Sequence, residues 1–129
     1  MAEKDVIRTD RAPGPFEGAP YNQAIRVGDF VFVAGQLGIS LETGVLAGAG
    51  VAEQTEQIMA NLGAILEAAG SGLDRLVKTT VFLMDLGDFA AMNDVYAKHV
   101  GDRPPARSTV QISGLPSGAL VEIEAIAHS

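Results

Sequence analysis

The alternation of apolar and polar residues divides most of the chain into short strands and two longer helices. Alternating or β-branched stretches of about four to eight residues are typical of strands, and apolar residues at helical spacing are typical of helices. The predicted strands are 21–27, 30–35, 76–84, 107–112 and 120–125, with a shorter candidate at 45–46. The predicted helices are 51–69 and 89–100. The order is therefore β-β-(β)-α-β-α-β-β, where the bracket marks 45–46.

Turn and capping residues mark the ends of these elements. Gly28 and Asp29 form a two-residue hairpin turn between the first two strands. Gly70 suits the position directly after the first helix, and Asp88 is a good N-cap for the second. Residues 1–20 are rich in proline and glycine, which predicts an irregular lead-in that can end in a short strand.

This order predicts a single α+β domain over residues 1–129, with one mixed sheet and both helices on one of its faces. The strand at 30–35 is apolar on both sides, so one set of its residues has no helix to pack against. That set is either Phe30 and Phe32 with their neighbour Ala34, or Val31 and Val33. An uncovered apolar face on a small domain predicts a closed homo-oligomer that buries it between subunits.

The last two predicted strands flank a segment, 113–118, with the glycine, proline and serine of a turn. We therefore expect an antiparallel hairpin in which Thr109 lies opposite Glu122 and Arg107 lies opposite Glu124. Residues directly opposite each other share a face, so Arg107 and Glu122 would project from the same side of the sheet. We expect this polar face in a pocket within or beside the subunit interface.

Composition narrows the classes of function. The 129 residues are 47% hydrophobic and 19% charged, which is typical of a globular domain. The net charge of −7, without a basic run, argues against nucleic acid as a partner. The chain has no cysteine, no signal-like apolar N-terminus and no apolar run of the roughly 18 residues that span a membrane. We expect a soluble, cytoplasmic protein.

Two weaker patterns predict neither a phosphate loop nor a metal site. Gly44, Gly48 and Gly50 precede a helix, but the rest of a phosphate-loop motif is missing, so they indicate an ordinary turn. His99 and His128 are the only histidines, and neither has an acidic cluster at ligand spacing.

Five segments spread along the chain match a known family of small proteins. They are Ala19-Pro20-Tyr21-Asn22-Gln23-Ala24, Val33-Ala34-Gly35-Gln36, Val77-Lys78-Thr79-Thr80-Val81, Met92-Asn93-Asp94-Val95-Tyr96, and Pro105-Ala106-Arg107-Ser108 through Val121-Glu122-Ile123. On these segments the chain resembles the reactive-intermediate deaminase family (RidA, also called YjgF). The resemblance covers essentially the whole chain, and the combination is highly specific.

The resemblance implies a chorismate-mutase-like fold assembled as a homotrimer, with clefts between subunits that bind small carboxylic acids. It implies hydrolytic deamination of 2-imino acids such as 2-iminobutanoate and 2-iminopropanoate, and of their enamine tautomers, to 2-keto acids and ammonia. Pyridoxal-phosphate enzymes of amino-acid metabolism release such imines, and the resemblance implies no cofactor for the protein itself. The expected partners are small 2-imino and 2-keto acids and further copies of the chain.

The resemblance also implies roles for individual residues. Arg107 matches the arginine that binds the substrate carboxylate, Glu122 the glutamate linked to the attacking water, and Tyr21 the tyrosine of the cleft. These three are the predicted catalytic residues.

Four further positions are predicted to bind substrate together with Arg107. Gly35 and Thr109 match positions that line the pocket, and Asn93 matches a motif asparagine near the cleft. Ala34 stands where the most studied members have serine, and Thr109 where several have cysteine. The missing serine hydroxyl at Ala34 affects the expected rate and choice of substrate. The change at Thr109 matters less, because its side chain still presents a hydroxyl to the pocket.

The chemistry is consistent with these residues. A protonated C=N bond is already electrophilic, so Arg107 needs only to hold the carboxylate while Glu122 positions a water and accepts its proton. From the residues alone, an arginine and a glutamate on one sheet face more often form a structural ion pair. The alternatives are a non-catalytic carboxylate-binding or chaperone-like protein of the same fold and a related subfamily with another enamine substrate. The endoribonuclease activity attached to the family is disfavoured by the net charge of −7.

Overall fold

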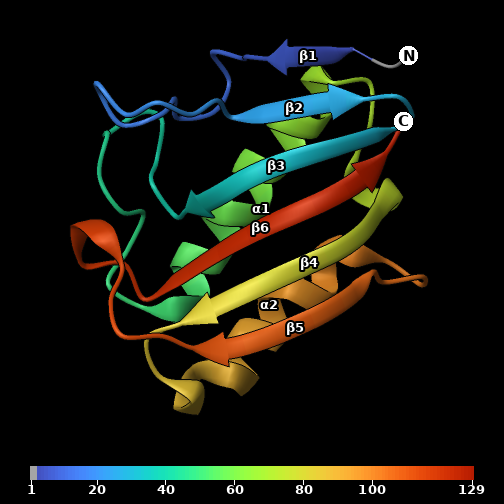
Figure 1. The fold of residues 1–129 in the computed structure, drawn as a ribbon. Coiled ribbons are helices and arrows are strands. Elements are labelled where there is room, and N and C mark those ends of the chain that lie inside the picture. Colours follow the sequence, from blue (N-terminus) through green and yellow to red (C-terminus); the bar gives the residue numbers. More distant parts are fainter. Residues whose placement is uncertain (1–2) are drawn as a thin grey trace.

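The computed structural model describes residues 3–129, which form a six-stranded sheet with two α-helices packed on it (Figure 1). The strands are β1 (Lys4–Ile7), β2 (Ala24–Val27), β3 (Phe30–Leu37), β4 (Leu76–Leu83), β5 (Ala106–Gln111) and β6 (Val121–His128). The helices are α1 (Val51–Ala68) and α2 (Phe89–Val100), and the short 3₁₀ turns are η1 (Leu73–Arg75), η2 (Leu86–Asp88) and η3 (Pro116–Gly118).

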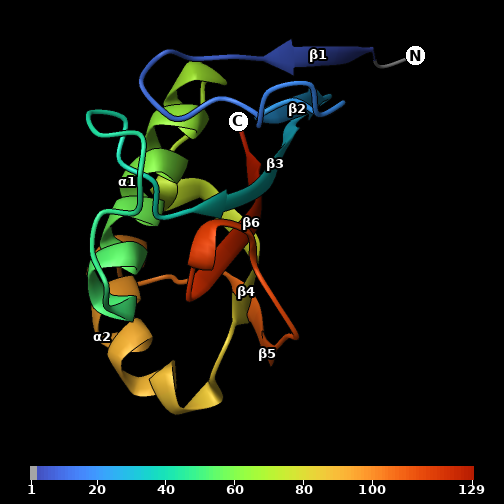
Figure 2. The same cartoon turned by 90° about the vertical axis from the view of Figure 1, so that its left-hand side faces the viewer.

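The sheet has the strand order β1-β2-β3-β6-β4-β5. Every neighbouring pair is antiparallel except β4 and β5, which are parallel and joined through α2. Figure 2 shows α1 and α2 on the same side of the sheet. The predicted α+β class, with one mixed sheet and both helices on one face, is confirmed. Within residues 3–129 neither helix has the length and apolarity that crossing a membrane requires.

The two faces of β3 show which side the helices cover. Val31 and Val33 are buried beneath the helices, whereas Phe30 and Phe32 each remain 46% exposed on the opposite side, called here the open face. The core accordingly lies between the helices and the inner side of the sheet. Its largest fully buried side chains include residues of α1 at helical spacing and alternate residues of β6, namely Ile58, Met59, Leu62, Ile65, Leu66, Val121 and Ile123.

The predicted hairpin of the last two strands is wrong, because β4 lies between β5 and β6. Arg107 lies opposite Thr79 of β4, which faces the helices, while Glu122 lies opposite Phe82 of β4 on the open face. Arg107 and Glu122 therefore project from opposite faces. The turn chemistry of residues 113–118 specifies a reversal of the chain but not which strand β6 joins. Burial favours the central position, because the apolar residues of β6 are fully covered there, between β3 and β4.

Smaller differences concern the ends of elements. β2 begins at Ala24 rather than residue 21, β1 arises within the predicted irregular lead-in, and residues 45–46 contribute only an isolated bridge between Ile39 and Leu46. Asp88 precedes α2 as expected but makes no side-chain capping bond. The carboxylate that caps a turn here is that of Asp85, which accepts from the Gly87 N–H at 2.7 Å.

Two buried amides of α1 hold the loops at one end of the sheet. Gln54 donates from Nε2 to the Gly48 carbonyl at 3.0 Å and accepts at Oε1 from the Leu120 N–H at 2.9 Å. Asn61 donates from Nδ2 to the carbonyls of Leu37 and Ile39, at 3.3 and 3.1 Å. These bonds satisfy loop backbone groups that the sheet leaves unpaired, so the loops are fixed relative to the core.

Candidate functional site

Glu122 lies at the start of the central strand β6, at one end of the sheet and beside a bulge in β3. The register of β3 against β6 shifts between Val33 and Gln36, where Ala34 and Gly35 lie opposite the single residue Glu124. A Cβ atom on Gly35 would collide with Oε1 of Glu122. The bulge thus brings backbone without a side chain against the Glu122 carboxylate, and glycine is the residue that permits this approach.

The environment of Glu122 favours its protonated form. Burial, followed by the neighbouring negative charge of Glu124, raises the pKa of the Glu122 carboxyl above its ordinary value of 4.5. A carboxylate with a raised pKa is a better proton acceptor than one in water. The site therefore makes Glu122 a stronger proton acceptor than an exposed glutamate.

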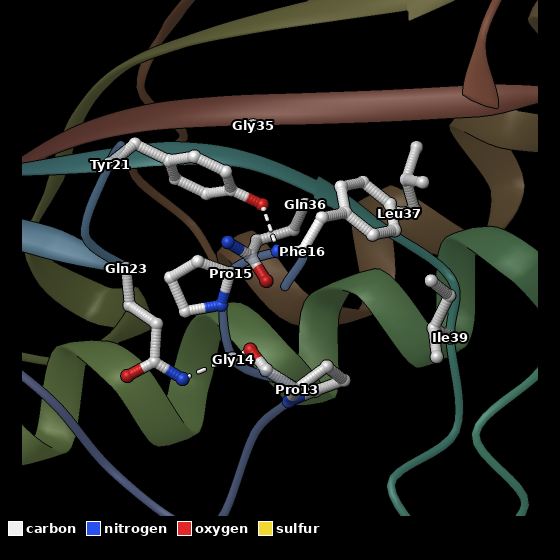
Figure 3. A pocket seen from close by; sticks show the side chains of 10 residues that line it. All are labelled: Pro13, Gly14, Pro15, Phe16, Tyr21, Gln23, Gly35, Gln36, Leu37 and Ile39. Carbon is white, nitrogen blue, oxygen red and sulfur yellow. Dashed lines mark hydrogen bonds between the residues drawn. The ribbon is translucent and has the colours of Figure 1, made fainter. Parts of the chain in front are cut away.

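Tyr21 lies at the same end of the sheet, in the loop before β2. Its hydroxyl accepts a hydrogen bond from the Phe16 N–H at 2.9 Å, and its side chain lines a cavity of about 40 Å³ together with Gly35 and Leu37 (Figure 3). Gly35 thus lines the same cavity as Tyr21 and also lies against the Glu122 carboxylate. Ala34 is held in the bulge by its backbone, since its N–H donates to the Gln23 carbonyl and its carbonyl accepts from Gln36 Nε2. We call Tyr21, Ala34, Gly35 and Glu122 the Glu122 cluster.

Gln23 anchors the loop that carries one wall of this cavity. Its side chain is buried, its Oε1 accepts from the Thr9 N–H at 2.8 Å, and its Nε2 donates to the carbonyls of Thr9 and Ala12 at 3.2 and 3.3 Å. Nε2 also donates to the Pro13 carbonyl at 3.0 Å (Figure 3). Within residues 3–129 the segment from Thr9 to Pro13 pairs with no strand, so the Gln23 amide supplies backbone hydrogen bonds that a neighbouring strand would otherwise make.

We expect Gln23→Glu to lower the free energy of unfolding by about 3 kcal/mol, measured by urea denaturation. The carboxylate would face carbonyl oxygens without an N–H to offer them, and a buried, unsatisfied charged group is costly. Gln111→Glu is the matched control because Gln111 is exposed and uses only its Oε1, which accepts from the Leu86 N–H at 2.9 Å. A similar loss in both variants would contradict the role given to Gln23.

Arg107 lies at the opposite edge of the sheet, on the helix-facing side of β5. Its guanidinium carbon is 4.9 Å from the centre of the Tyr96 ring and 5.4 Å from that of the Phe89 ring, both in α2. Both distances are within the range of cation–π attraction. Among the residues that the structure describes, Arg107 forms no ion pair with a carboxylate. The structural ion pair between Arg107 and Glu122 that the residues alone favoured is therefore absent from the described part of the chain.

Asn93 and Thr109 lie near Arg107. Asn93 lines a cavity of about 380 Å³ with Arg107 and Tyr96, and its Oδ1 is buried without a hydrogen-bond partner in the described chain. Thr109 is half-buried on the same face as Arg107, two residues along β5, opposite Val81. We call Arg107, Asn93 and Thr109 the Arg107 cluster. It offers a cation and an unused acceptor, which together suit a ligand with an anionic group and an N–H or O–H donor.

The structure thus separates the predicted site residues into two clusters. Two strand spacings, about 10 Å in total, separate β6 from β5, and the two clusters point away from each other across the sheet. Residues 3–129 contain no group of three or more histidine or acidic side chains arranged to hold a metal ion. Sequence reasoning missed Tyr96, Phe89 and Gln23, although Tyr96 and Gln23 fall within the motif segments.

Comparisons with known proteins agree over nearly the whole chain. Residues 11–129 match the family model described as endoribonuclease L-PSP. A RutC family protein of Pyrococcus abyssi is 50% identical over 97% of this chain and 97% of its own. The human 2-iminobutanoate/2-iminopropanoate deaminase is 42% identical over 95% of this chain and 88% of its own. The structure of Escherichia coli TdcF with bound serine is 40% identical, with a TM-score of 0.88, and covers 97% of this chain and 98% of its own.

Proposed function

This chain belongs to the RidA/YjgF family, and on that premise we propose that it hydrolyses 2-imino acids and their enamine tautomers to 2-keto acids and ammonia. The observation that carries the proposal is the state of Arg107. Its guanidinium is half-buried against two rings and has no protein carboxylate among the described residues. Such a cation is suited to the carboxylate of a ligand, and a planar guanidinium binds a carboxylate through two parallel hydrogen bonds.

A small 2-imino acid cannot contact both clusters within one subunit. In such a substrate the carboxylate carbon is bonded directly to the imine carbon, whereas Arg107 and Glu122 project from opposite faces. The proposed site therefore combines Arg107 of one subunit with Glu122 of a neighbour, in a cleft of a homotrimer. The exposed Phe30 and Phe32 of the open face, beside β6, support burial of that face between subunits.

In the proposed reaction Arg107 holds the carboxylate, and the amide oxygen of Asn93 accepts a hydrogen bond from the protonated imine nitrogen. Glu122 orients a water molecule and accepts one of its protons as the water oxygen bonds to the imine carbon. Glu122 then gives this proton to the nitrogen of the resulting carbinolamine. The C–N bond breaks and ammonia leaves as Glu122 accepts the hydroxyl proton and the C=O bond of the keto acid forms. Orientation supplies most of the acceleration, because the substrate is already electrophilic.

The first test generates 2-iminobutanoate with a threonine dehydratase and follows its decay by trapping with semicarbazide. Wild type is expected to accelerate decay at substoichiometric concentration, and Arg107→Ala to return the rate close to that in buffer. Arg103→Ala, which removes an exposed arginine of the loop before β5, is the matched control and is expected to keep the activity. Decay at the buffer rate with wild type, together with protection against heating by 2-ketobutyrate, would indicate a carboxylate-binding protein and overturn the proposed reaction.

We expect the acidic limb of the kcat/KM profile to shift to lower pH in Glu124→Gln. Glu122 must be ionised to accept a proton, so activity falls as the pH decreases through its raised pKa, and this limb lies above pH 4.5 in wild type. Removing the negative charge of Glu124 removes one cause of the raised pKa.

The control for this profile is Glu42→Gln, which makes the same change of charge in the exposed loop after β3. Its acidic limb is expected to coincide with that of wild type. A limb that stays in place in Glu124→Gln would show that a group other than Glu122 controls it.

A further inference from the structure

Tyr96 and Thr79 form a buried support beneath Arg107. The Tyr96 side chain is buried in α2, which runs behind β4 and β5 (Figure 1), and its hydroxyl forms a 2.7 Å hydrogen bond with Thr79 Oγ1. Thr79 is fully buried in β4 and is the direct strand partner of Arg107. A closed path therefore runs from the Arg107 backbone through β4 to Thr79, through the hydroxyl bond to Tyr96, and from the ring back to the guanidinium.

The Tyr96 ring, which Arg107 contacts, is restrained by its hydroxyl bond and by packing in the core. The Thr79 bond prevents the phenol from swinging along the sheet, and the core around α2 prevents it from tilting. Phe89, the second ring, is 42% exposed in the first turn of α2 and has no hydroxyl to anchor it. Of the two rings that contact the guanidinium, Tyr96 is therefore the more restrained and Phe89 the less restrained.

An arginine side chain loses considerable rotamer freedom when it is immobilised. If that loss occurs during folding, a carboxylate ligand does not have to offset it again on binding. We propose that Tyr96, braced by Thr79, is a positioning residue that holds the Arg107 guanidinium in its binding orientation before substrate arrives. This inference rests on the proposed function only for its kinetic consequence, because the order of Arg107 is a property of the ligand-free protein.

The direct test is the ¹⁵N relaxation of arginine side chains in the ligand-free protein, with the Arg107 Nε–H signal assigned by its loss in Arg107→Lys. Arg107 is expected to show a high heteronuclear NOE and upfield-shifted Hδ protons, because its side chain lies over a ring. The exposed Arg103 is the internal reference for a mobile side chain. An Arg107 signal as mobile as that of Arg103 in wild type overturns the proposal without any variant.

Substitutions then separate the ring from its anchor. Tyr96→Leu removes the ring, and we expect Arg107 to become mobile and KM for 2-iminobutanoate to rise about tenfold with little change in kcat, because the carboxylate is held equally in ground and transition states. Tyr96→Phe keeps the ring and loses the hydroxyl, which bonds to Thr79 and also interacts with Arg107, so a rise of about twofold to threefold is expected. Unchanged order of Arg107 in a folded Tyr96→Leu overturns the proposal. If that variant does not fold, the wild-type relaxation and the Tyr96→Phe kinetics still decide it.

The two readouts separate this inference from the proposed reaction. An ordered Arg107 that loosens in Tyr96→Leu, in a protein without deaminase activity, leaves the positioning role intact and removes the reaction. Turnover of the imine by a protein whose Arg107 is mobile would support the reaction and overturn the positioning role of Tyr96.

Discussion

Two inactive variants, Arg107→Ala and Glu122→Gln, are expected to regain activity when they are unfolded together and refolded as a mixture. In the proposed cleft one subunit supplies Arg107 and its neighbour supplies Glu122. Random assembly then leaves about a quarter of the clefts with both residues intact, since each has about an even chance of being present. The mixture is therefore expected to reach about a quarter of the wild-type kcat, far above either parent, with the KM of wild type. The measurement is the imine-decay assay applied to each parent and to the equimolar mixture.

A site formed within a single chain predicts a different result for the mixture. If Arg107 and Glu122 served one substrate from the same chain, every subunit in the mixture would carry one defect and no activity would return. Wild type refolded with Arg107→Ala is the control for the refolding procedure and should keep about half of the wild-type activity. The prediction depends on the two residues facing opposite sides of the sheet, a relation fixed by the register of β4 with β5 and β6.

Recovery of activity in the mixture would show that Arg107 and Glu122 serve one site although the predicted hairpin that placed them together is wrong. Alternation in β6 correctly indicated that Glu122 and Glu124 share one side and Val121 and Ile123 the other. Alternation cannot indicate which strand lies alongside, because a strand buried on one face can pair with any neighbour that continues that face. The turn before β6 then favoured the nearest strand in the sequence.

In β5 even the inward face could not be deduced from apolar positions. Val110, which alternation alone assigns to the apolar face, is 40% exposed, while Arg107 and Thr109 face the helices. The strand lies at the edge of the sheet, where aromatic rings of α2 cover the guanidinium instead of aliphatic side chains. Because the buried apolar groups here belong to α2 and not to β5, the sequence of β5 shows no apolar inner face.

Helix α1, in contrast, was predictable because its buried residues form a regular pattern. α1 was predicted to within one residue, since its buried positions repeat at helical spacing and Gly70, with φ of +79°, ends it in the left-handed region. The buried amides Gln23, Gln54 and Asn61 were not predictable, because a single polar residue that satisfies a distant loop has no periodic signal. The assignment of site residues depended on motif resemblance, and the roles of those residues remain predictions.

Gly35→Ala is expected to reduce kcat about 100-fold, because a displacement of about 1 Å at a reacting group can cost that much. The added Cβ would occupy the position of Glu122 Oε1, and the adjoining backbone is fixed by the bonds of Ala34 to Gln23 and Gln36. The carboxylate must therefore move, and the bulge cannot. Stability is expected to fall by only about 1–3 kcal/mol, because Glu122 is half-buried and can rotate away. Imine decay and urea unfolding measure the two effects.

The double variant Gly35→Ala/Glu122→Gln tests whether this loss acts through the carboxylate. If it does, the double variant is no less active than Glu122→Gln alone, because the second change displaces a group that no longer functions. Fully additive losses would mean that Gly35 contributes through its own backbone, for example by contact with substrate, and would contradict the positioning role. Gly114→Ala is the control, because a Cβ there meets no atom within 4 Å, and it is expected to leave kcat unchanged. Near-wild-type activity in Gly35→Ala would mean that the position of Glu122 against the bulge is unimportant, and the assignment of Glu122 as the proton acceptor would then fail.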